Sequence, residues 1–337
     1  METMTRRDAI RRFGLAGMAA AMAPRDLFAQ DKILLGEGRH TYEWIRNWAK
    51  LPEGMKFVGR THGYVAIDSK DRAYFNTDTE NSIMVFESDG TFVKSWGKQF
   101  TKVHGMWVTK EGGREIVWIC ARGENEVVKC TLDGEVLLTI PYPEKSGVYK
   151  DKTEYKPTGV CVGPNGDVYV GDGYGKSWVH QWTGAGEYVR SWDGSAREGG
   201  KFKTPHGMCA DLRGPEPRII VADRENGRLQ WFTLDGKFVA EAKEGLRRPC
   251  TVMIRDGDLL VPDLQGRVTI LDKDNKLVVH MGENDDPAKQ AKFPIKPEEW
   301  KDGQFISPHG AAWDSRGDLY VEDWNESGRI NKLRRVV

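Results

Sequence analysis

The sequence predicts an all-β protein, a six-bladed β-propeller, and three observations lead to this prediction. A short motif recurs six times along the chain. Each copy is followed by short apolar segments separated by polar turns, which together are typical of a four-stranded blade. Successive copies are 42 to 59 residues apart, near the roughly 40–50 residues expected of a propeller blade.

The recurring motif opens each repeat and carries one variable side chain, which we call the slot residue. It is histidine in Thr61-His62-Gly63, Val103-His104-Gly105, Pro205-His206-Gly207 and Pro308-His309-Gly310, and another residue in Pro157-Thr158-Gly159 and Pro249-Cys250-Thr251. Blades are therefore predicted to start near residues 61, 103, 157, 205, 249 and 308. If the repeats close into a ring, the six slot residues converge on its axis.

The second predicted strand of four repeats ends near an aspartate. Apolar triplets such as Val168–Val170 are followed two residues later by an acidic residue: Asp172, Asp223, Asp263 and Asp323. Turns such as Leu234-Asp235-Gly236 then precede the fourth strand, and Asx-Gly sequences favour tight hairpins. Each repeat therefore reads as four antiparallel strands.

The last repeat holds only three predicted strands before Val337, which would leave a sheet edge open. The segment from Tyr42 to Trp48 has the alternation of a strand and lies upstream of the first repeat. We expect this N-terminal strand to complete blade six and close the ring. Residues 31–337 are then one propeller domain.

Residues 1–30 are predicted to serve targeting. Arg6-Arg7 precedes a short apolar run, Phe13–Ala23, which resembles a bacterial twin-arginine signal peptide. The run is too short to span a bilayer. We expect export to the periplasm or outside the cell by the twin-arginine (Tat) machinery, without stable membrane insertion after cleavage. An amphipathic N-terminal helix is the alternative.

Composition excludes two classes of partner. The chain has 50 basic and 50 acidic residues, so its charge indicates neither nucleic acid nor an anionic membrane as a partner. A small-molecule or peptide-derived substrate is expected instead. Of the five cysteines, Cys120 and Cys130 lie on two arms of one predicted hairpin and could form a disulfide.

Four of the seven histidines are slot residues, which indicates a metal site because neutral imidazole is a common ligand for zinc, copper and iron. Catalytic zinc usually has three protein ligands and an open position, whereas a fourth ligand closes the shell. Cys250 occupies a slot as well, where it could be a ligand, a nucleophile or a small filler. These residue types leave the metal open.

The segments Val221–Arg228 and Val170–Tyr174, together with the spaced slots at His104, His206 and His309, resemble the peptidyl-α-hydroxyglycine α-amidating lyase family of NHL-repeat six-bladed propellers. The resemblance implies a zinc-dependent lyase that cleaves a carbinolamide to a primary amide and glyoxylate. It implies that His104, His206 and His309 bind zinc. Tyr174 would be the catalytic base and Arg224 would bind the substrate carboxylate.

These roles are physically consistent, since a nearby cation can lower the pKa of a tyrosine and a guanidinium can bind a carboxylate by two hydrogen bonds. Two positions depart from the family. Thr77 stands where the family has a second arginine. Gly310 stands where it has an aspartate linked to a structural calcium, so the resemblance gives no support for calcium here.

Other functions stay open beside a metal-dependent lyase. A binding propeller could use the histidines to hold a structural ion. A related zinc hydrolase, or an oxidoreductase with iron or copper, could use the same ring with Cys250 as a further ligand. The longest connection between repeats, Gly282–Ser307, is charged and is expected to cover the metal.

Overall fold

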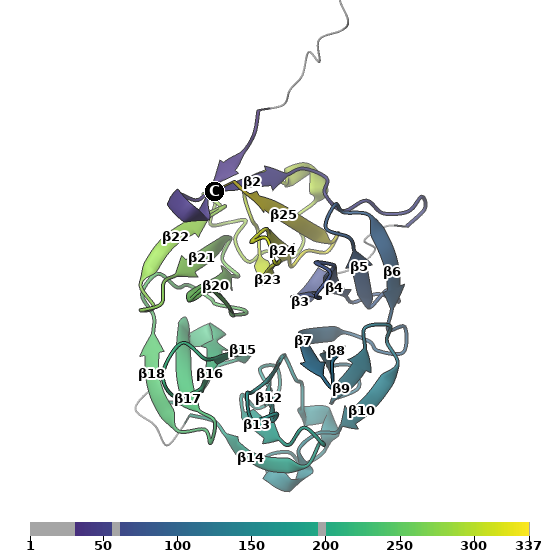
Figure 1. The fold of residues 1–337 in the computed structure, drawn as a ribbon, viewed down its shortest axis with the longest axis vertical. Helices are drawn as coiled ribbons and strands as arrows, with labels where there is room; N and C mark the ends of the chain where they lie inside the picture. The colour runs from purple at the N-terminus through teal and green to yellow at the C-terminus, as the bar shows by residue number, and fades with distance from the viewer. Residues whose placement is uncertain (1–30, 56–60, 195–199, 337) are drawn as a thin grey trace, which may run out of the picture. The chain divides into compact units, whose positions relative to one another are not determined.

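Six antiparallel sheets are arranged around one axis in the computed structural model, which describes residues 31–55, 61–194 and 200–336 (Figure 1). The innermost strand of each sheet contains or follows a slot motif, and the chain runs outward from it strand by strand. Figure 1 shows β3, β7, β15 and β23 nearest the centre of the ring. The predicted six-bladed all-β propeller is confirmed.

The strands of the six blades follow the predicted order of four per repeat. Blades 1 to 3 contain β3 Thr61–Ile67, β4 Ala73–Thr77, β5 Ile83–Phe86, β6 Phe92–Trp96, β7 Val103–Glu111, β8 Arg114–Ala121, β9 Glu126–Thr131, β10 Val136–Ile140, β11 Gly159–Val162, β12 Val168–Gly171, β13 Val179–Trp182 and β14 Tyr188–Trp192. Blades 4 to 6 contain β15 Pro205–Asp211, β16 Arg218–Asp223, β17 Arg228–Thr233, β18 Phe238–Ala242, β19 Met253–Arg255, β20 Asp258–Asp263, β21 Arg267–Leu271, β22 Leu277–Met281, β23 Pro308–Trp313, β24 Leu319–Asp323 and β25 Arg329–Arg335. Five short 3-10 helices lie in connections of the described residues: Gly38–His40, Glu144–Ser146, Lys152–Glu154, Arg224–Asn226 and Pro297–Glu299.

The N-terminal segment closes the ring as predicted. Strand β2, Tyr42–Ile45, pairs antiparallel with β25, with Tyr42 opposite Arg335 and Ile45 opposite Lys332. A short strand β1, Leu34–Leu35, adds a fifth strand outside β2. Blade six therefore combines the two ends of the propeller, which protects the edge that β25 would otherwise expose.

The hydrophobic cores lie between blades. One cluster joins blades 1 and 2 through residues such as Tyr74 and Met106. Another joins blades 6 and 1 through Trp48, Phe75 and Tyr320. The other four clusters likewise combine residues of adjacent blades. Since each blade buries its faces against its neighbours, Ile33–Val337 form one compact unit.

The proposed disulfide between Cys120 and Cys130 is wrong, because the two thiols lie on opposite faces of blade 2. In the β8–β9 pair, Cys120 is opposite Val127 and Cys130 is opposite Val117. Cys120 packs in the core toward blade 3, whereas Cys130 packs in the core toward blade 1. Both are free and buried.

The targeting prediction falls on residues 1–30, which lie outside the described residues. Among the residues that are described, no helix has the length and apolar character needed to cross a membrane.

Candidate functional site

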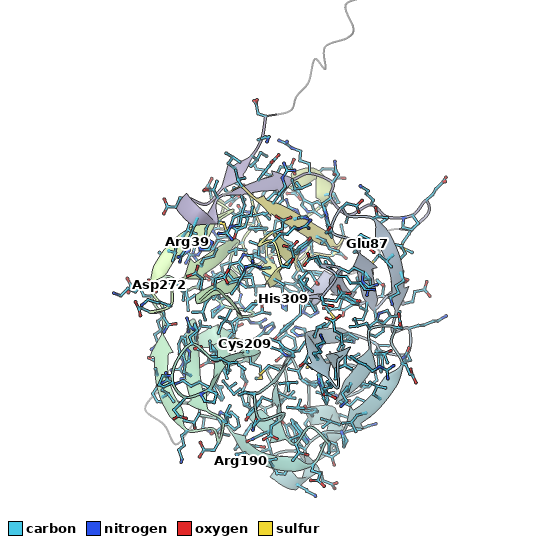
Figure 2. All side chains as sticks on the ribbon, viewed as in Figure 1. Arg39, Glu87, Arg190, Cys209, Asp272 and His309 are labelled. Atoms are coloured by element: carbon cyan, nitrogen blue, oxygen red, sulfur yellow. The ribbon has the colours of Figure 1, made fainter. Side chains whose placement is uncertain are left out.

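The four slot histidines converge at the centre of the ring, where Figure 2 shows His309. The imidazole centroids of His62 and His104 are 4.8 Å apart, and those of His104 and His206 are 4.7 Å apart. His309 lies 4.6 Å from His206 and 5.0 Å from His62. Residues up to 247 positions apart in sequence therefore form one imidazole cluster.

The strand pairing is irregular at each histidine slot. In all four histidine blades, the pairing of the innermost strand with its neighbour shifts register at the slot, for example between Pro205 and Gly207 and between Pro308 and Gly310. A bulge leaves one residue outside the ladder and redirects its side chain. The sequence motif marks the slot, but the irregular pairing became visible only in the structure.

Glycine after the slot allows the blades to approach at the axis. A Cβ added at Gly159 would lie 2.6 Å from the carbonyl oxygen of His206, and one at Gly207 would lie 2.4 Å from that of Cys250. At Gly310 it would lie 2.5 Å from the carbonyl oxygen of Gly63. A side chain at Gly310 therefore does not fit, and the family's calcium-linked aspartate has no equivalent here.

Backbone carbonyls of the following blade fix the tautomer of three histidines. In each pair the histidine Nδ1 is the donor, because a carbonyl oxygen can only accept: His104 to Thr158 at 2.6 Å, His206 to Cys250 at 2.9 Å and His309 to Gly63 at 2.9 Å. In each of these histidines Nε2 then carries the lone pair that could bind an ion or accept a hydrogen bond. This orientation by an outer hydrogen bond is typical of metal-binding histidines.

The donor set fits a metal ion. Nε2 of His104 and Nε2 of His309 are buried without a hydrogen-bond partner, which is costly for a polar atom unless a ligand is bound there. Burial holds the pKa of both side chains well below the usual value, so they are neutral and able to coordinate. The ligand atoms of His62, His104 and His309 all lie within 4.8 Å of one another.

Cys250 belongs to a second group of close ligand atoms, with His206 and His309, again within 4.8 Å. The three histidines implied by the family resemblance are thus divided between two groups that share His309. Burial raises the pKa of the Cys250 thiol to about 12. Without a bound ion the thiol is protonated, which disfavours the nucleophile that the sequence left open.

His62 has a different environment from the other three histidines. Its Nδ1 faces a carboxylate oxygen of Asp78 at 3.6 Å, too far for a hydrogen bond. Trp324 packs on His62 with ring centroids 5.5 Å apart, and Phe293 packs on Trp324 at 4.9 Å. Phe293 belongs to the Gly282–Ser307 connection, so this connection reaches the histidine cluster through Trp324.

The second-strand aspartates position the slots. Asp172 accepts a hydrogen bond from the backbone N–H of Lys156, two residues before the slot at Thr158. Asp323 accepts from the N–H of Ser307, two residues before His309. Asp223 and Asp263 bind the corresponding segments of blades 4 and 5. The aspartate pattern in the sequence therefore has a structural purpose beside the site.

Tyr174 lies directly beside the histidine cluster. Its hydroxyl donates to Nε2 of His206 at 3.0 Å and accepts from Nη1 of Arg224 at 3.1 Å. The guanidinium carbons of Arg122 and Arg224 lie 5.4 and 5.3 Å from the centroid of its ring. The structure thus brings Tyr174 and Arg224 next to the histidines.

Two opposing effects act on the pKa of Tyr174. Burial raises the pKa of Tyr174 above its usual value, although the charge of Arg224 and its hydrogen bond act in the opposite direction. The hydroxyl therefore holds its proton in this arrangement. Desolvation of the phenol outweighs the effect of the neighbouring cation on its pKa, and the sequence could not reveal how strongly the phenol is desolvated.

Arg122 is a site residue that the sequence analysis missed. It follows β8 at the position where Arg224 follows β16, since Val103 is opposite Ala121 and Pro205 is opposite Asp223. Nε of Arg122 is buried without a partner. The repeat alignment could have found it, but Ala121 replaces the aspartate that marks this position in four other blades.

Thr77 does not contribute a charge to the site. Its hydroxyl is bound to the hydroxyl of Thr79 and to the carbonyl of Asn81 within its own hairpin. The second arginine that the family would place after this strand is absent from this position. Arg122, from the adjacent blade, supplies a guanidinium next to Tyr174 instead.

Blade 3 also contains a buried network of hydrogen-bonded polar side chains. Tyr149 donates to a carboxylate oxygen of Asp172 at 2.6 Å and is 2.7 Å from Nε2 of His180. Nδ1 of His180 is 2.6 Å from the hydroxyl of Ser191. Burial lowers the pKa of His180 to about 3 and raises that of Asp172 to about 6.

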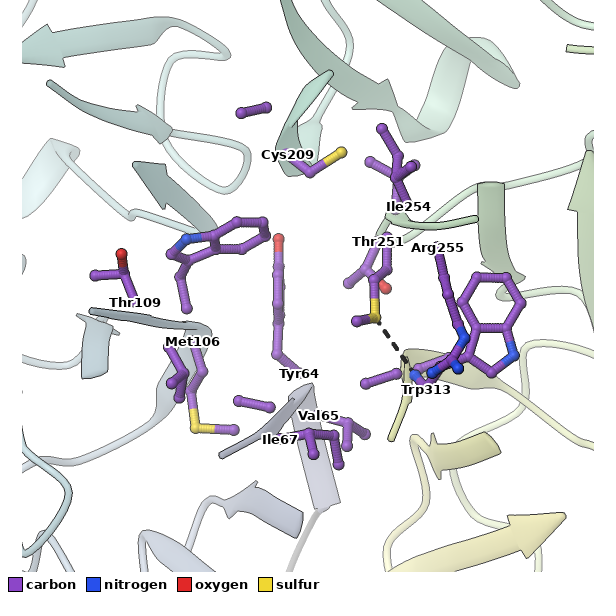
Figure 3. A pocket seen from close by; sticks show the side chains of 18 of the residues that line it. Tyr64, Val65, Ile67, Met106, Thr109, Cys209, Thr251, Ile254, Arg255 and Trp313 are labelled. Carbon is purple, nitrogen blue, oxygen red and sulfur yellow. Dashed lines mark hydrogen bonds between the residues drawn. The ribbon is translucent and has the colours of Figure 1, made fainter. Parts of the chain in front are cut away.

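A cavity lies elsewhere on the axis, lined by the inner strands. It has a volume of about 840 Å³ and is lined by residues that follow the slots along the inner strands, including Met106, Trp107 and Ile254. Figure 3 shows Tyr64 extending from β3 into this space. The Tyr64 hydroxyl donates to the carbonyl of His206 at 3.2 Å, so Tyr64 lies between the cavity and the histidines.

Comparisons with known proteins agree with the fold and the sequence resemblance. The NHL repeat model matches residues 155–182. NHL repeat-containing protein 3 of Homo sapiens is 28% identical over 210 residues, which cover 56% of this chain and 55% of that protein. Peptidylglycine alpha-amidating monooxygenase of Rattus norvegicus is 32% identical over 175 residues, which cover 49% of this chain and 17% of that protein.

A third relative is a peptidyl-alpha-hydroxyglycine alpha-amidating lyase of Drosophila melanogaster, 29% identical over 192 residues that cover 52% of this chain and 34% of that protein. The chain therefore spans about half or less of the length of these curated relatives.

Two solved structures share the fold at low sequence identity. A streptogramin B lyase superposes with a TM-score of 0.58 at 16% identity, covering 83% of this chain and 95% of that one. A gluconolactonase from Xanthomonas campestris has a TM-score of 0.56 at 14% identity, covering 83% of this chain and 87% of that chain. The chain is therefore a six-bladed propeller with a match to the NHL repeat, and about half of its sequence is similar to peptidyl-α-hydroxyglycine α-amidating lyases at about 30% identity.

Proposed function

We propose that this protein is a metal-dependent lyase that cleaves the carbon–nitrogen bond of a carbinolamide bearing a carboxylate. The observation that carries the proposal is the position of Tyr174, with its hydroxyl on His206 and guanidinium groups of Arg122 and Arg224 beside its ring. The names of two relatives support a peptidyl-α-hydroxyglycine as substrate.

Arg122 and Arg224 give the site its preference for an anion. Arg224 is buried, and among the ion pairs of the described residues its carboxylate partner is Glu225, which also pairs with Arg248. Arg122 has no acidic partner among the ion pairs found in the described residues. A substrate carboxylate between the two guanidinium groups would offset their charge through charge-assisted hydrogen bonds. It would also hold the neighbouring carbinol carbon near Tyr174.

The reaction needs one proton moved and no redox partner. The carbinol hydroxyl loses its proton, the carbon–oxygen double bond of glyoxylate forms, the carbon–nitrogen bond breaks, and the amide nitrogen gains a proton. Tyr174 is placed to exchange a proton with the substrate hydroxyl, since its own hydroxyl already joins two polar groups. Arg224 stabilises negative charge on the phenolic oxygen when that oxygen gives up its proton.

The ion would be held by donors of the cluster formed by His62, His104, His206, Cys250 and His309. A divalent ion there would supply Lewis acidity toward the substrate hydroxyl or carboxylate and would favour the ionised form of Tyr174. Zinc suits this nitrogen-rich donor set, and iron or copper would also be bound by it. We include in the proposal export by the twin-arginine route to the periplasm.

The test uses purified full-length protein and α-hydroxyhippurate, a small N-acyl-α-hydroxyglycine, with glyoxylate release as the signal. Tyr174→Phe should retain the metal content of the native protein and lose glyoxylate release. Tyr188→Phe is the matched control, because Tyr188 lies on the outer strand β14 and its hydroxyl contacts only Ser191. This control should keep both the metal and the activity.

Arg122→Met separates binding from chemistry. Loss of one carboxylate contact should raise KM by roughly tenfold or more, since a hydrogen bond to a charged group contributes about 1.5–3 kcal/mol. Metal content should not change. Protein that keeps its metal but releases no glyoxylate from any α-hydroxyglycine would refute the lyase and favour a binding propeller with a structural ion.

A further inference from the structure

We propose that the axis offers two alternative positions for a single metal ion, which share His309, and that Cys250 thiolate completes the second position. The inference deepens the proposed function and rests on its premise that the histidine cluster binds a metal. The donors of the first position are His62, His104 and His309, and those of the second are His206, Cys250 and His309.

The shared histidine makes the two positions mutually exclusive. Nδ1 of His309 donates to the carbonyl of Gly63 at 2.9 Å, so only Nε2 can coordinate. Nε2 has one lone pair, and one lone pair serves one ion. Two ions would each need His309, which excludes a binuclear centre that uses both complete donor sets.

The two positions differ in what they leave for Tyr174. With the ion on His62, His104 and His309, the hydroxyl of Tyr174 keeps its hydrogen bond to Nε2 of His206 at 3.0 Å. With the ion in the second position, Nε2 of His206 is a ligand and can no longer accept this bond. Tyr174 then retains Arg224 as its hydrogen-bond partner. The position of the ion therefore decides whether the Tyr174 hydroxyl is engaged or available to substrate.

The donor atoms also differ in the ions they prefer. Three imidazole nitrogens form a site of intermediate softness, whereas a thiolate favours zinc and other soft ions. The sulfur of Cys250 has a weak contact with the carbonyl of Arg248 at 3.8 Å, and it also interacts with the guanidinium of Arg224, whose positive charge favours the thiolate. A coordinating thiol gives up its proton to bind the metal. Cys250 is fully buried, so the sulfur is protected from oxidants in solution.

Cobalt(II) is the probe, because a cobalt–thiolate bond gives a charge-transfer band in the near ultraviolet that cobalt–imidazole bonds lack. Full-length protein freed of metal is titrated with cobalt(II), and bound cobalt is counted by elemental analysis. We expect one cobalt per chain, with the charge-transfer band. Cys250→Ser should still bind one cobalt per chain, in the first position, and should lose the band.

Two further variants control the assignment. Cys209→Ser is the matched thiol control, since Cys209 is buried on inner strand β15 three residues after its slot, and it should keep the band. His62→Gln weakens only the first position. The charge-transfer band of this variant should therefore be at least as strong as that of the native protein. If Cys250→Ser does not fold, Cys250→Ala provides the same comparison.

Each outcome separates this inference from the proposed function. One cobalt per chain without a charge-transfer band in the native protein would overturn the thiolate position and leave a histidine metal site intact. Two bound cobalt ions per chain would overturn the shared-ligand argument. Loss of the band in His62→Gln would show that His62 and Cys250 bind the same ion, which also overturns it. Failure to bind any cobalt would overturn both proposals.

Discussion

Replacing Gly159 with alanine would place a methyl group where the inner strands of blades 3 and 4 touch. The new Cβ would lie 2.5 Å from the hydroxyl oxygen of Tyr64, 2.6 Å from the carbonyl oxygen of His206 and 3.1 Å from Cα of Gly207. Two of these three atoms are backbone atoms. The strands must therefore separate, because only the tyrosine can turn away.

The cost follows from these contacts. Adding a methyl group to a packed interior costs about 1–3 kcal/mol. Displacing Tyr64 also breaks its hydrogen bond to His206, which contributes about 1 kcal/mol. We expect Gly159→Ala to lower the free energy of unfolding by about 2–4 kcal/mol, a large share of the roughly 5–15 kcal/mol typical of a domain.

Urea unfolding followed by tryptophan fluorescence measures this loss. Gly214→Ala is the matched control, because the only neighbour of a Cβ at Gly214 is the carbonyl oxygen of Glu216, 3.9 Å away. The control should change stability by about 1 kcal/mol or less, in the stabilising direction. In the double variant Gly159→Ala/Tyr64→Phe, the new methyl group no longer meets the tyrosine hydroxyl. Its loss of unfolding free energy should therefore be about 1 kcal/mol smaller than the sum of the losses in the two single variants.

Equal stability of Gly159→Ala and Gly214→Ala would refute the argument that glycine at this position is required by backbone contact at the axis. If the losses of stability in the double variant are additive, the methyl group does not meet the hydroxyl of Tyr64. Metal binding gives a second measurement. Thr158, the neighbour of Gly159, supplies the carbonyl that orients His104, so Gly159→Ala should also weaken metal retention.

Three further predictions concern other buried groups. Because burial lowers the pKa of His180 to about 3, folding should lose stability as pH falls from about 6.5 toward 3, by at most about 1.4 kcal/mol per unit; His180→Gln should show a smaller loss in urea unfolding between pH 7 and 4. Tyr64→Phe should lower stability by about 1–2 kcal/mol, since the carbonyl of His206 loses its donor, and an unchanged urea midpoint would contradict this. Cys120 and Cys130 should react with a thiol reagent only after denaturation, without prior reduction; failure to react in denaturant would indicate a disulfide.

Much of the fold follows from local sequence. The alternation of apolar residues, the Asx-Gly turns and the six slots predicted the blades, and the open sheet in blade 6 predicted the closing strand at Tyr42. These features depend on residues close together in the chain, so their periodicity carries the information. Strand β1 was missed because Leu34–Leu35 is too short to show a pattern.

The site was predictable wherever the repeat itself marked it. His62, His104, His206 and His309 were found because they occupy one position in the repeat, and Tyr174 was placed by the family resemblance. Arg122 was missed although it occupies the same repeat position as Arg224. Its blade lacks the preceding aspartate, so the alignment of repeats had no marker there.

The sequence by itself determined the number of blades, the closing strand and the convergence of the slot residues, because each repeat folds under the same local constraints. Only the tertiary structure decided which donors group together, that the Tyr174 hydroxyl meets Nε2 of His206, and that desolvation raises the pKa of Tyr174. These properties depend on distances across the ring and on exclusion of water, which arise when all six blades pack together. A local pattern holds no information about either.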